Sequence, residues 1–154
     1  MVVVEPSFAP RGESVSEQEH GVRAHSVITG EHRHLASLFD EARAALETDG
    51  GGEAAQEALQ RLVDSMEAHF QREESLYYPT IWSLRPDLKE SLTGLIETHP
   101  QFRDRFEAIR GALAAASAAE AGRHFEEFAD LFSDHERAEE LLLRSLDVDL
   151  TASA

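Results

Sequence analysis

Apolar residues recur every three or four positions along most of this chain, which is the spacing of one buried face of an α-helix. Glycines 50–52, the segment around Pro86 and Ser117 interrupt that pattern, and Ser117 with Glu120 has the spacing of a capping box. We therefore expect four helices, at about 22–47, 53–82, 87–115 and 117–146. Because short loops join long helices, consecutive helices should be antiparallel neighbours, which predicts an all-α fold: an up-down-up-down antiparallel four-helix bundle.

The chain of 154 residues suits one domain with a flexible segment at each end. Residues 1–20 are rich in Pro, Ser, Gly and Glu and lack an apolar period, so we expect a flexible N-terminal tail there. The bundle itself should span residues 21–147, and residues 148–154 should form a C-terminal tail.

Six polar residues stand at positions where the apolar stripes of these helices require buried side chains. In the second and fourth helices a glutamate follows a histidine four positions later, on the same helical face. A buried polar group costs several kcal/mol unless a partner satisfies it. The six residues are His32, His69, Glu73, His99, His135 and Glu139.

The four histidines of this set should lie in one layer of the bundle. Counted from each turn, the two histidines that flank it differ in depth by about two residues or fewer, which is roughly 3 Å at the rise of an α-helix. The other histidines fail this test: His34 falls on the opposite face, His25 and His124 lie roughly 10 and 16 Å along the axis, and His20 belongs to the tail. One layer with four imidazoles and two carboxylates therefore predicts a site in the core.

Imidazoles with carboxylates and without thiolates suit iron, manganese or zinc. The set fits a dinuclear metal site in which His32 and His69 hold one ion, His99 and His135 hold the other, and Glu73 and Glu139 bridge them. The alternative is a metal-free network of hydrogen bonds among the same side chains.

Charge and composition narrow the remaining classes of function. The net charge of −16 argues against nucleic acid or an anionic membrane surface as a partner. The chain has no cysteine, which excludes disulfides and thiolate metal sites, and its apolar runs are too short for a membrane span. The first residues lack the features of a signal peptide, so we expect a cytoplasmic protein. For the oligomeric state we expect either a monomer or a homodimer.

Four segments resemble the hemerythrin-like (HHE cation-binding) family over about residues 22–146. They are Gly-Glu-His-Arg-His-Leu at 30–35, His-Phe-Gln-Arg-Glu-Glu-Ser-Leu-Tyr-Tyr-Pro at 69–79, Glu-Thr-His at 97–99 and Asp-His-Glu-Arg-Ala-Glu-Glu at 134–140. The resemblance implies a four-helix bundle around a non-haem di-iron site, with two iron ions, a bridging oxo or hydroxo group, and O₂, peroxide or NO as partners. Manganese or zinc are the alternative metals.

The chain departs from the oxygen-carrying members of that family at two places. Where the carriers have a second histidine on the third helix, this chain has Arg103, which cannot ligate a cation. The last helix pairs His135 with a carboxylate four positions later, whereas the carriers place an aspartate five positions later. Each iron would then keep exchangeable positions, which favours a di-iron oxidoreductase that activates O₂ or decomposes peroxide. The alternative is a sensor or reservoir module for O₂, NO or iron, without turnover.

Two further residues are candidates for a catalytic role beside the metals. Tyr77 lies one helical turn after Glu73 and is placed to hydrogen-bond a carboxylate or a bound oxygen species, or else to pack in the core. Arg103 is placed to attract an anion or pair with a bridging glutamate, or else to lie at the rim. A pocket for a small-molecule substrate is expected near these two side chains. Pro100, directly after His99, predicts a kink or a split in the third helix.

Overall fold

The computed structural model describes the backbone of residues 15–152 and the side chains of residues 25–144 and 146. This part of the chain is all helical and contains no strand, which confirms the predicted all-α class. Its elements, in chain order, are α1 (Val15–Asp49), α2 (Glu53–Arg72), the π-helix η1 (Glu73–Tyr77), α3 (Tyr78–Leu84), the short 3₁₀ helix η2 (Pro86–Leu88), α4 (Lys89–Glu97), α5 (His99–Ala114) and α6 (Ala118–Ala152).

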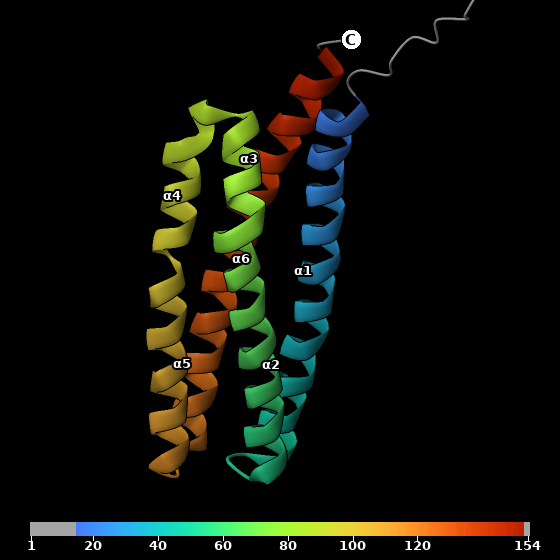
Figure 1. The fold of residues 1–154 in the computed structure, drawn as a ribbon. Helices are drawn as coiled ribbons and strands as arrows, with labels where there is room; N and C mark the ends of the chain where they lie inside the picture. The colour runs from blue at the N-terminus through green and yellow to red at the C-terminus, as the bar shows by residue number, and fades with distance from the viewer. Residues whose placement is uncertain (1–14, 153–154) are drawn as a thin grey trace, which may run out of the picture.

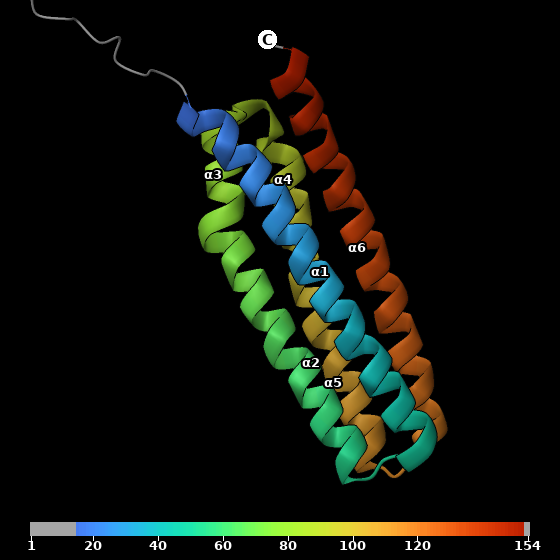
Figure 2. The same cartoon turned by 90° about the vertical axis from the view of Figure 1, so that its right-hand side faces the viewer.

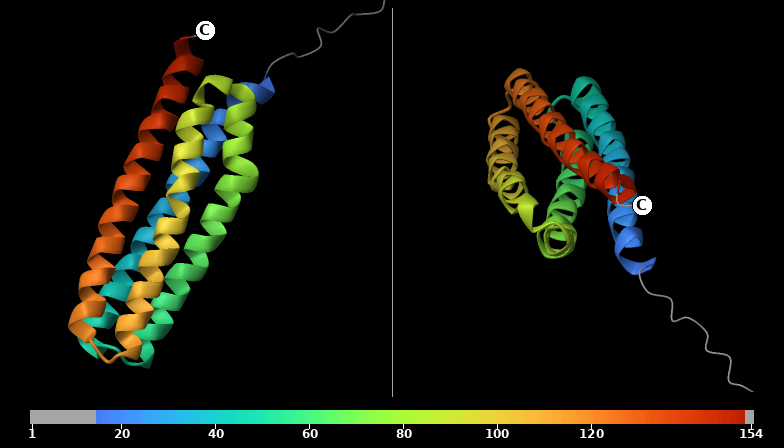
Figure 3. Two further views of the ribbon diagram at one scale, coloured as in Figure 1. Left: turned by 90° about the vertical axis from the view of Figure 1, so that its left-hand side faces the viewer. Right: turned by 90° about the horizontal axis from the view of Figure 1, so that it is seen from above.

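These elements form long, side-by-side segments (Figures 1 and 2). The α1–α2 and α5–α6 connections lie at one end of the molecule, and the α3–α4 connection lies at the other end, near the start of α1 and the end of α6. Close backbone packing joins α1 to α2, α5 to α6 and α1 to α6. The view along the molecule shows α2 and α5 on the side away from the α1–α6 contact (Figure 3).

The helices at both ends of the described chain are longer than expected. Helix α1 begins at Val15, so residues 15–20, which we expected in the flexible tail, are helical. Helix α6 continues to Ala152, into the segment 148–154 that we expected to be a tail. Residues 1–14 and 153–154 of the predicted tails lie outside the described residues. No helix in the described chain is both long enough and apolar enough to cross a membrane.

Two of the expected helices are interrupted. The second contains a π-helical turn at Glu73–Tyr77, between α2 and α3. The third is split at Thr98, between α4 and α5, where Pro100 in the first turn of α5 has no backbone N–H to donate. Both interruptions fall beside the polar layer.

The π-helical turn changes which side chains face the core. A π-helix adds one residue to a turn, so that the inward positions after Glu73 move forward by one. A regular helical period counted from Glu73 would bury Leu76, but Leu76 is 55% exposed, whereas Tyr77, Tyr78 and Ile81 are buried.

The apolar core has two parts, with the polar layer between them. The larger cluster surrounds the phenylalanines Phe39, Phe70, Phe102, Phe128 and Phe132. The smaller cluster lies towards the α3–α4 end and contains Ile28, Tyr77, Tyr78, Ile81, Leu92, Leu95, Leu143 and Leu146. Apolar side chains on both sides shield the polar layer from bulk water.

Candidate metal centre

All six predicted residues are buried and come together in one layer. Each of them is 4% exposed or less, although each carries polar or ionisable atoms. They come from every long segment of the fold: His32 from α1, His69 and Glu73 from α2 and η1, His99 from the first turn of α5, and His135 and Glu139 from α6.

The six side chains divide into two clusters that share a carboxylate. Position 1 contains His32, His69, Glu73 and Glu139, and position 2 contains Glu73, His99 and His135. Within each position the candidate ligand atoms lie within 4.8 Å of one another. Two ligands on one ion, each about 2.1 Å away, stand at most about 4.2 Å apart, so both clusters need only small adjustments to hold a cation.

Both carboxylates face the two positions at once. Glu73 Oε1 lies 2.6 Å from His69 Nε2, and Glu73 Oε2 lies 2.9 Å from His99 Nε2 and 3.8 Å from His135 Nε2. Glu139 Oε1 lies 3.1 Å from His32 Nε2, and its Oε2 lies 3.7 Å from His135 Nε2. This is the arrangement that two bridging carboxylates require.

The atoms that face inward lack hydrogen-bond partners. Nε2 of all four histidines, both oxygens of Glu73 and Oε1 of Glu139 are buried without a hydrogen bond, even where two of them lie close together. Buried polar atoms are nearly always paired in native proteins. A convergent set of nitrogen and oxygen lone pairs without hydrogen-bond partners fits a site for cations.

The outward nitrogens of three histidines do have partners. His69 Nδ1 lies 3.0 Å from Glu31 Oε2, and His99 Nδ1 lies 2.6 Å from Glu74 Oε1. His135 Nδ1 lies 2.8 Å from the hydroxyl of Thr98, which itself donates to the carbonyl of Leu95. Because a carboxylate only accepts, and the Thr98 hydroxyl has already donated its proton, each Nδ1 must be the donor. The Nε2 lone pairs then point inward, as metal ligation requires.

These outer partners follow a cyclic order around the fold. Glu31 on α1 holds the histidine of α2, Glu74 on η1 holds that of α5, and Thr98 before α5 holds that of α6. Glu140 on α6 would close the circle, but its Oε1 lies 3.6 Å from His32 Nδ1, and no hydrogen bond forms. We call this set (Glu31, Glu74, Thr98 and Glu140) the outer ring.

The split between α4 and α5 explains one member of the outer ring. At the split, the Leu95 carbonyl accepts from the Thr98 backbone N–H at 3.2 Å and from the Thr98 hydroxyl at 2.6 Å. The interrupted helix therefore fixes the rotamer of Thr98 and turns its free lone pair towards His135. The split that we expected from Pro100 therefore helps to orient His135, which lies on a different helix, α6.

The electrostatics of the cluster favour positive charge. Burial opposes charge on His69, but Glu73 and Glu31 outweigh it and raise the pKa of His69 to about 9. Burial likewise opposes charge on His32, yet Glu139 raises its pKa. For Glu73 burial alone would raise the pKa, and the surrounding histidines instead lower it. At neutral pH these carboxylates therefore favour a second proton on the His69 imidazole, and a divalent cation, attracted by the same negative charge, would displace that proton from Nε2.

Tyr78 is a site residue that the sequence analysis missed. Its buried hydroxyl donates a hydrogen bond to Glu139 Oε2, and burial together with Glu139 and Glu73 raises its pKa, so the phenol keeps its proton. A regular helix would have presented Tyr77 here, one turn after Glu73. The π-helical turn moves that place forward by one residue.

The two predicted catalytic residues lie beside the cluster. Tyr77 is buried near Glu31 and Arg72, where burial and Glu31 raise its pKa. Arg103 is half exposed and forms a two-pronged ion pair with Glu67, with Nε 2.8 Å from Oε1 and Nη2 3.1 Å from Oε2.

The other described histidines lie outside the layer. His34 is exposed on α1, and His124 lies between Glu120 and Glu127 at 3.8 and 3.7 Å. His25 is half buried, at the end of the fold where α1 begins. The side chain of His20 lies outside the described residues.

An all-helical fold with two buried His and Glu clusters defines a candidate metal-binding protein. The family model of the hemerythrin HHE cation-binding domain matches residues 23–146, most of the chain. The chain therefore belongs to the hemerythrin HHE cation-binding family, and its two His and Glu clusters fit the cation binding for which that family is named. Neither the curated proteins nor the solved structures gave a significant match.

Proposed function

We propose that this protein is an up-down-up-down antiparallel four-helix bundle around a dinuclear non-haem iron centre that activates O₂ or decomposes peroxide. His32 and His69 would hold one ion at position 1, His99 and His135 the other at position 2, and Glu73 and Glu139 would bridge. The observation that carries the proposal is the set of inward Nε2 and carboxylate atoms that are buried without hydrogen bonds. The same donor set also accepts manganese or zinc.

Iron bound here would supply one-electron steps between its ferrous and ferric states. The side chains of the protein would orient the ligands and exclude water. The outer ring keeps protons on the Nδ1 atoms of His69, His99 and His135, so that their Nε2 atoms stay free to ligate. The two apolar clusters exclude water, which strengthens the attraction between the carboxylates and a cation.

Tyr78 gives the centre a fixed hydrogen-bond donor on Glu139. Its hydroxyl is buried, keeps its proton at neutral pH and lies on the carboxylate that faces both positions. Tyr78 is therefore better placed for that role than Tyr77 or Arg103, which stay candidates for supporting roles beside the centre.

The burial of the centre limits what reaches it. The residues nearest to both cation positions are at most 4% exposed, so a molecule as small as O₂, peroxide or NO fits the site better than a large substrate. The same observation favours the second candidate function, a sensor or reservoir that binds O₂, NO or iron without turnover.

Metal analysis and steady-state kinetics on one preparation test the proposal. We expect about two iron ions per chain, and continuous consumption of H₂O₂, or of O₂ with a reductant. The matched control is His34→Ala, which removes an exposed histidine next to the site and should retain both. Two irons without turnover, together with a spectral change on adding NO or O₂, would select the sensor, whereas a chain that binds no metal would overturn both functions.

A further inference from the structure

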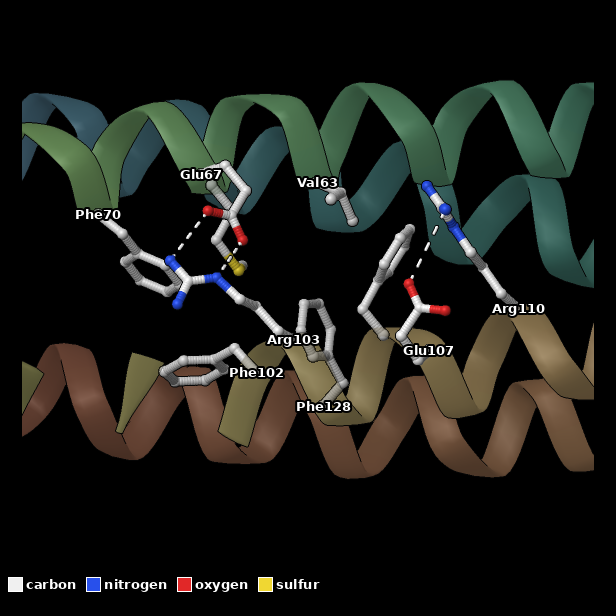
Figure 4. Close-up of a pocket in the computed structure, with 10 residues that line it drawn as sticks. Val63, Glu67, Phe70, Phe102, Arg103, Glu107, Arg110 and Phe128 are labelled. Carbon is white, nitrogen blue, oxygen red and sulfur yellow. Dashed lines mark hydrogen bonds and ion pairs between the residues drawn. The ribbon is translucent and has the colours of Figure 1, made fainter. Parts of the chain in front are cut away.

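A pocket beside the metal centre is not used by any step described above. It lies between α2 and α5, encloses about 230 Å³ and opens to the surface (Figure 4). Its lining comes from α2, α5 and α6, and α2 and α5 are not among the helix pairs that pack closely in the described chain. The space is thus a gap between two helices that their neighbours hold apart.

The floor of the pocket is apolar and rich in aromatic rings. Met66, Phe70, Phe102, Phe106 and Phe128 line it, and all five are buried against the rest of the core. Aromatic rings favour offset or edge-on contact with another ring, beyond the gain from burial alone. The floor therefore suits a flat aromatic molecule.

The rim of the pocket is charged but balanced. Arg103 is paired with Glu67 across the opening, and the Arg110 Nη1 lies 3.9 Å from Glu107 (Figure 4). Arg110 also lies over the Phe106 ring, and its Nη2 donates to Gln60 Oε1 at 2.5 Å. A charged ligand would have to break one of these pairs or bury its charge on an apolar floor, which costs free energy. The net charge of −16 further disfavours an anion.

Two aromatic rings of the floor also contact histidines of position 2. Phe70 stacks on His99 with centroids 4.0 Å apart and planes 12° apart, and Phe102 meets His135 edge-on at 5.4 Å. A molecule in the pocket would contact the side chains that pack directly on two candidate metal ligands.

We propose that this pocket binds a small, uncharged aromatic molecule of one or two fused rings, with the Arg103–Glu67 pair as its outer cover. A cavity of roughly 150 Å³ lined by apolar side chains is enough to bind benzene, so the volume here suits a slightly larger ring system. The binding of this molecule follows from the pocket alone. Its role as the substrate class of the metal centre rests on the proposed function.

Calorimetric titration of the iron-loaded protein with indole tests the proposal. Val63→Phe adds a ring inside the pocket and should weaken indole binding by about tenfold or more. The matched control is Ser65→Phe, which places the same ring on the other side of α2, in a depression next to α1, and should leave indole affinity within about twofold. Helicity and melting temperature check that both variants fold. If Val63→Phe does not fold, Val63→Leu adds one methylene to the same space and should weaken binding by about threefold.

The ligand class is tested with the same ring carrying a charge. Indole-3-carboxylate and tryptamine should each bind at least about tenfold more weakly than indole. Equal affinity of either ion, unchanged indole affinity in a folded Val63 variant, or a dimer that Val63→Phe dissociates would overturn the proposal. Metal content and peroxide turnover, measured on the same samples, keep the two proposals separate: turnover without indole binding contradicts only the pocket, and indole binding without metal contradicts only the centre.

Discussion

The two candidate cation positions differ in what holds their ligands in place. Position 1 gathers two carboxylates and two imidazoles, but one of its imidazoles, that of His32, has no hydrogen bond at Nδ1. Position 2 contains one carboxylate, Glu73, within its cluster, and Glu139 faces it from the edge, 3.7 Å from His135 Nε2. Both of its imidazoles are held from outside, by Glu74 at 2.6 Å and Thr98 at 2.8 Å. Position 1 therefore relies on negative charge and position 2 on preset ring orientation, which separates two contributions to affinity that most metal sites combine.

The largest expected effect comes from the carboxylate that the positions share. Glu73→Gln keeps the shape of the side chain but removes the charge between the two clusters, so both ions should be lost, and the metal content should fall from about two per chain to well below one. Glu67→Gln, on the exposed surface of the preceding helix α2, is the control and should retain both metals. Retention of two ions by Glu73→Gln would show that Glu73 is not a shared ligand.

Single histidine variants should break one position and leave the other. His135→Ala removes one of two imidazoles from position 2, and His32→Ala removes one from position 1, so each should retain about one ion per chain. The ions that remain in the two variants should differ in affinity, because position 1 keeps two carboxylates in the His135 variant. We expect that ion to survive a higher chelator concentration in a metal-release titration. Loss of both ions in either variant would mean that the positions fill only together.

The outer ring offers a smaller change confined to position 2. Thr98→Val keeps the shape of the side chain but removes the acceptor for His135 Nδ1, and loss of such a partner typically weakens metal affinity by about 10- to 100-fold. Competition with a chelating dye measures it, and affinity at position 1 should not change. Thr93→Val is the control, because its hydroxyl is exposed and bonds only the Lys89 carbonyl. Equal effects of the two variants would remove Thr98 from the site.

The smallest effect separates the two adjacent tyrosines. Tyr78→Phe deletes a hydrogen bond to a buried carboxylate and should lower the free energy of unfolding by about 2 kcal/mol. Tyr77→Phe deletes a hydroxyl that does not reach Glu139 and should cost less than about 1 kcal/mol. Urea denaturation of samples with equal metal content measures both, and the reverse order would contradict the register that the π-helical turn sets.

Much of the fold and the layer of six residues could be predicted from the sequence. The helical period is strong, and the glycines at 50–52 and Pro86 fix the turns, so counting residues gave the depth of His32, His69, His99 and His135. All four are buried in the structure. An α-helix has a constant rise, so residue number is a measure of height along the bundle.

Which side chains face the core after Glu73 could not be predicted in the same way. A regular period counted from Glu73 places Leu76 and Tyr77 in the core, and one inserted residue in the π-helical turn places Tyr77 and Tyr78 there instead. Nothing in the helical period of the local sequence marks that turn.

The outer ring has a recognisable position in the sequence. Glu31, Glu74, Thr98 and Glu140 are each directly next to a predicted ligand in the sequence. A residue one position away on a helix is rotated by about 100°, towards the flank where the neighbouring helix lies. Polar residues directly beside predicted ligands are therefore candidates for orienting the histidine on the next helix, although which neighbour they reach depends on the packing.

The cyclic order of the outer ring has a consequence for the connectivity of the chain. Each helical segment orients the ligand of the next, and the last would orient that of the first, so the pattern does not depend on where the polypeptide starts. The start of α1 and the end of α6 also lie at the same end of the molecule (Figure 1). A circular permutant, opened at the α1–α2 turn and joined through the former ends, would keep every pairing between ligand and partner. Spatial neighbourhood rather than chain order thus defines this centre.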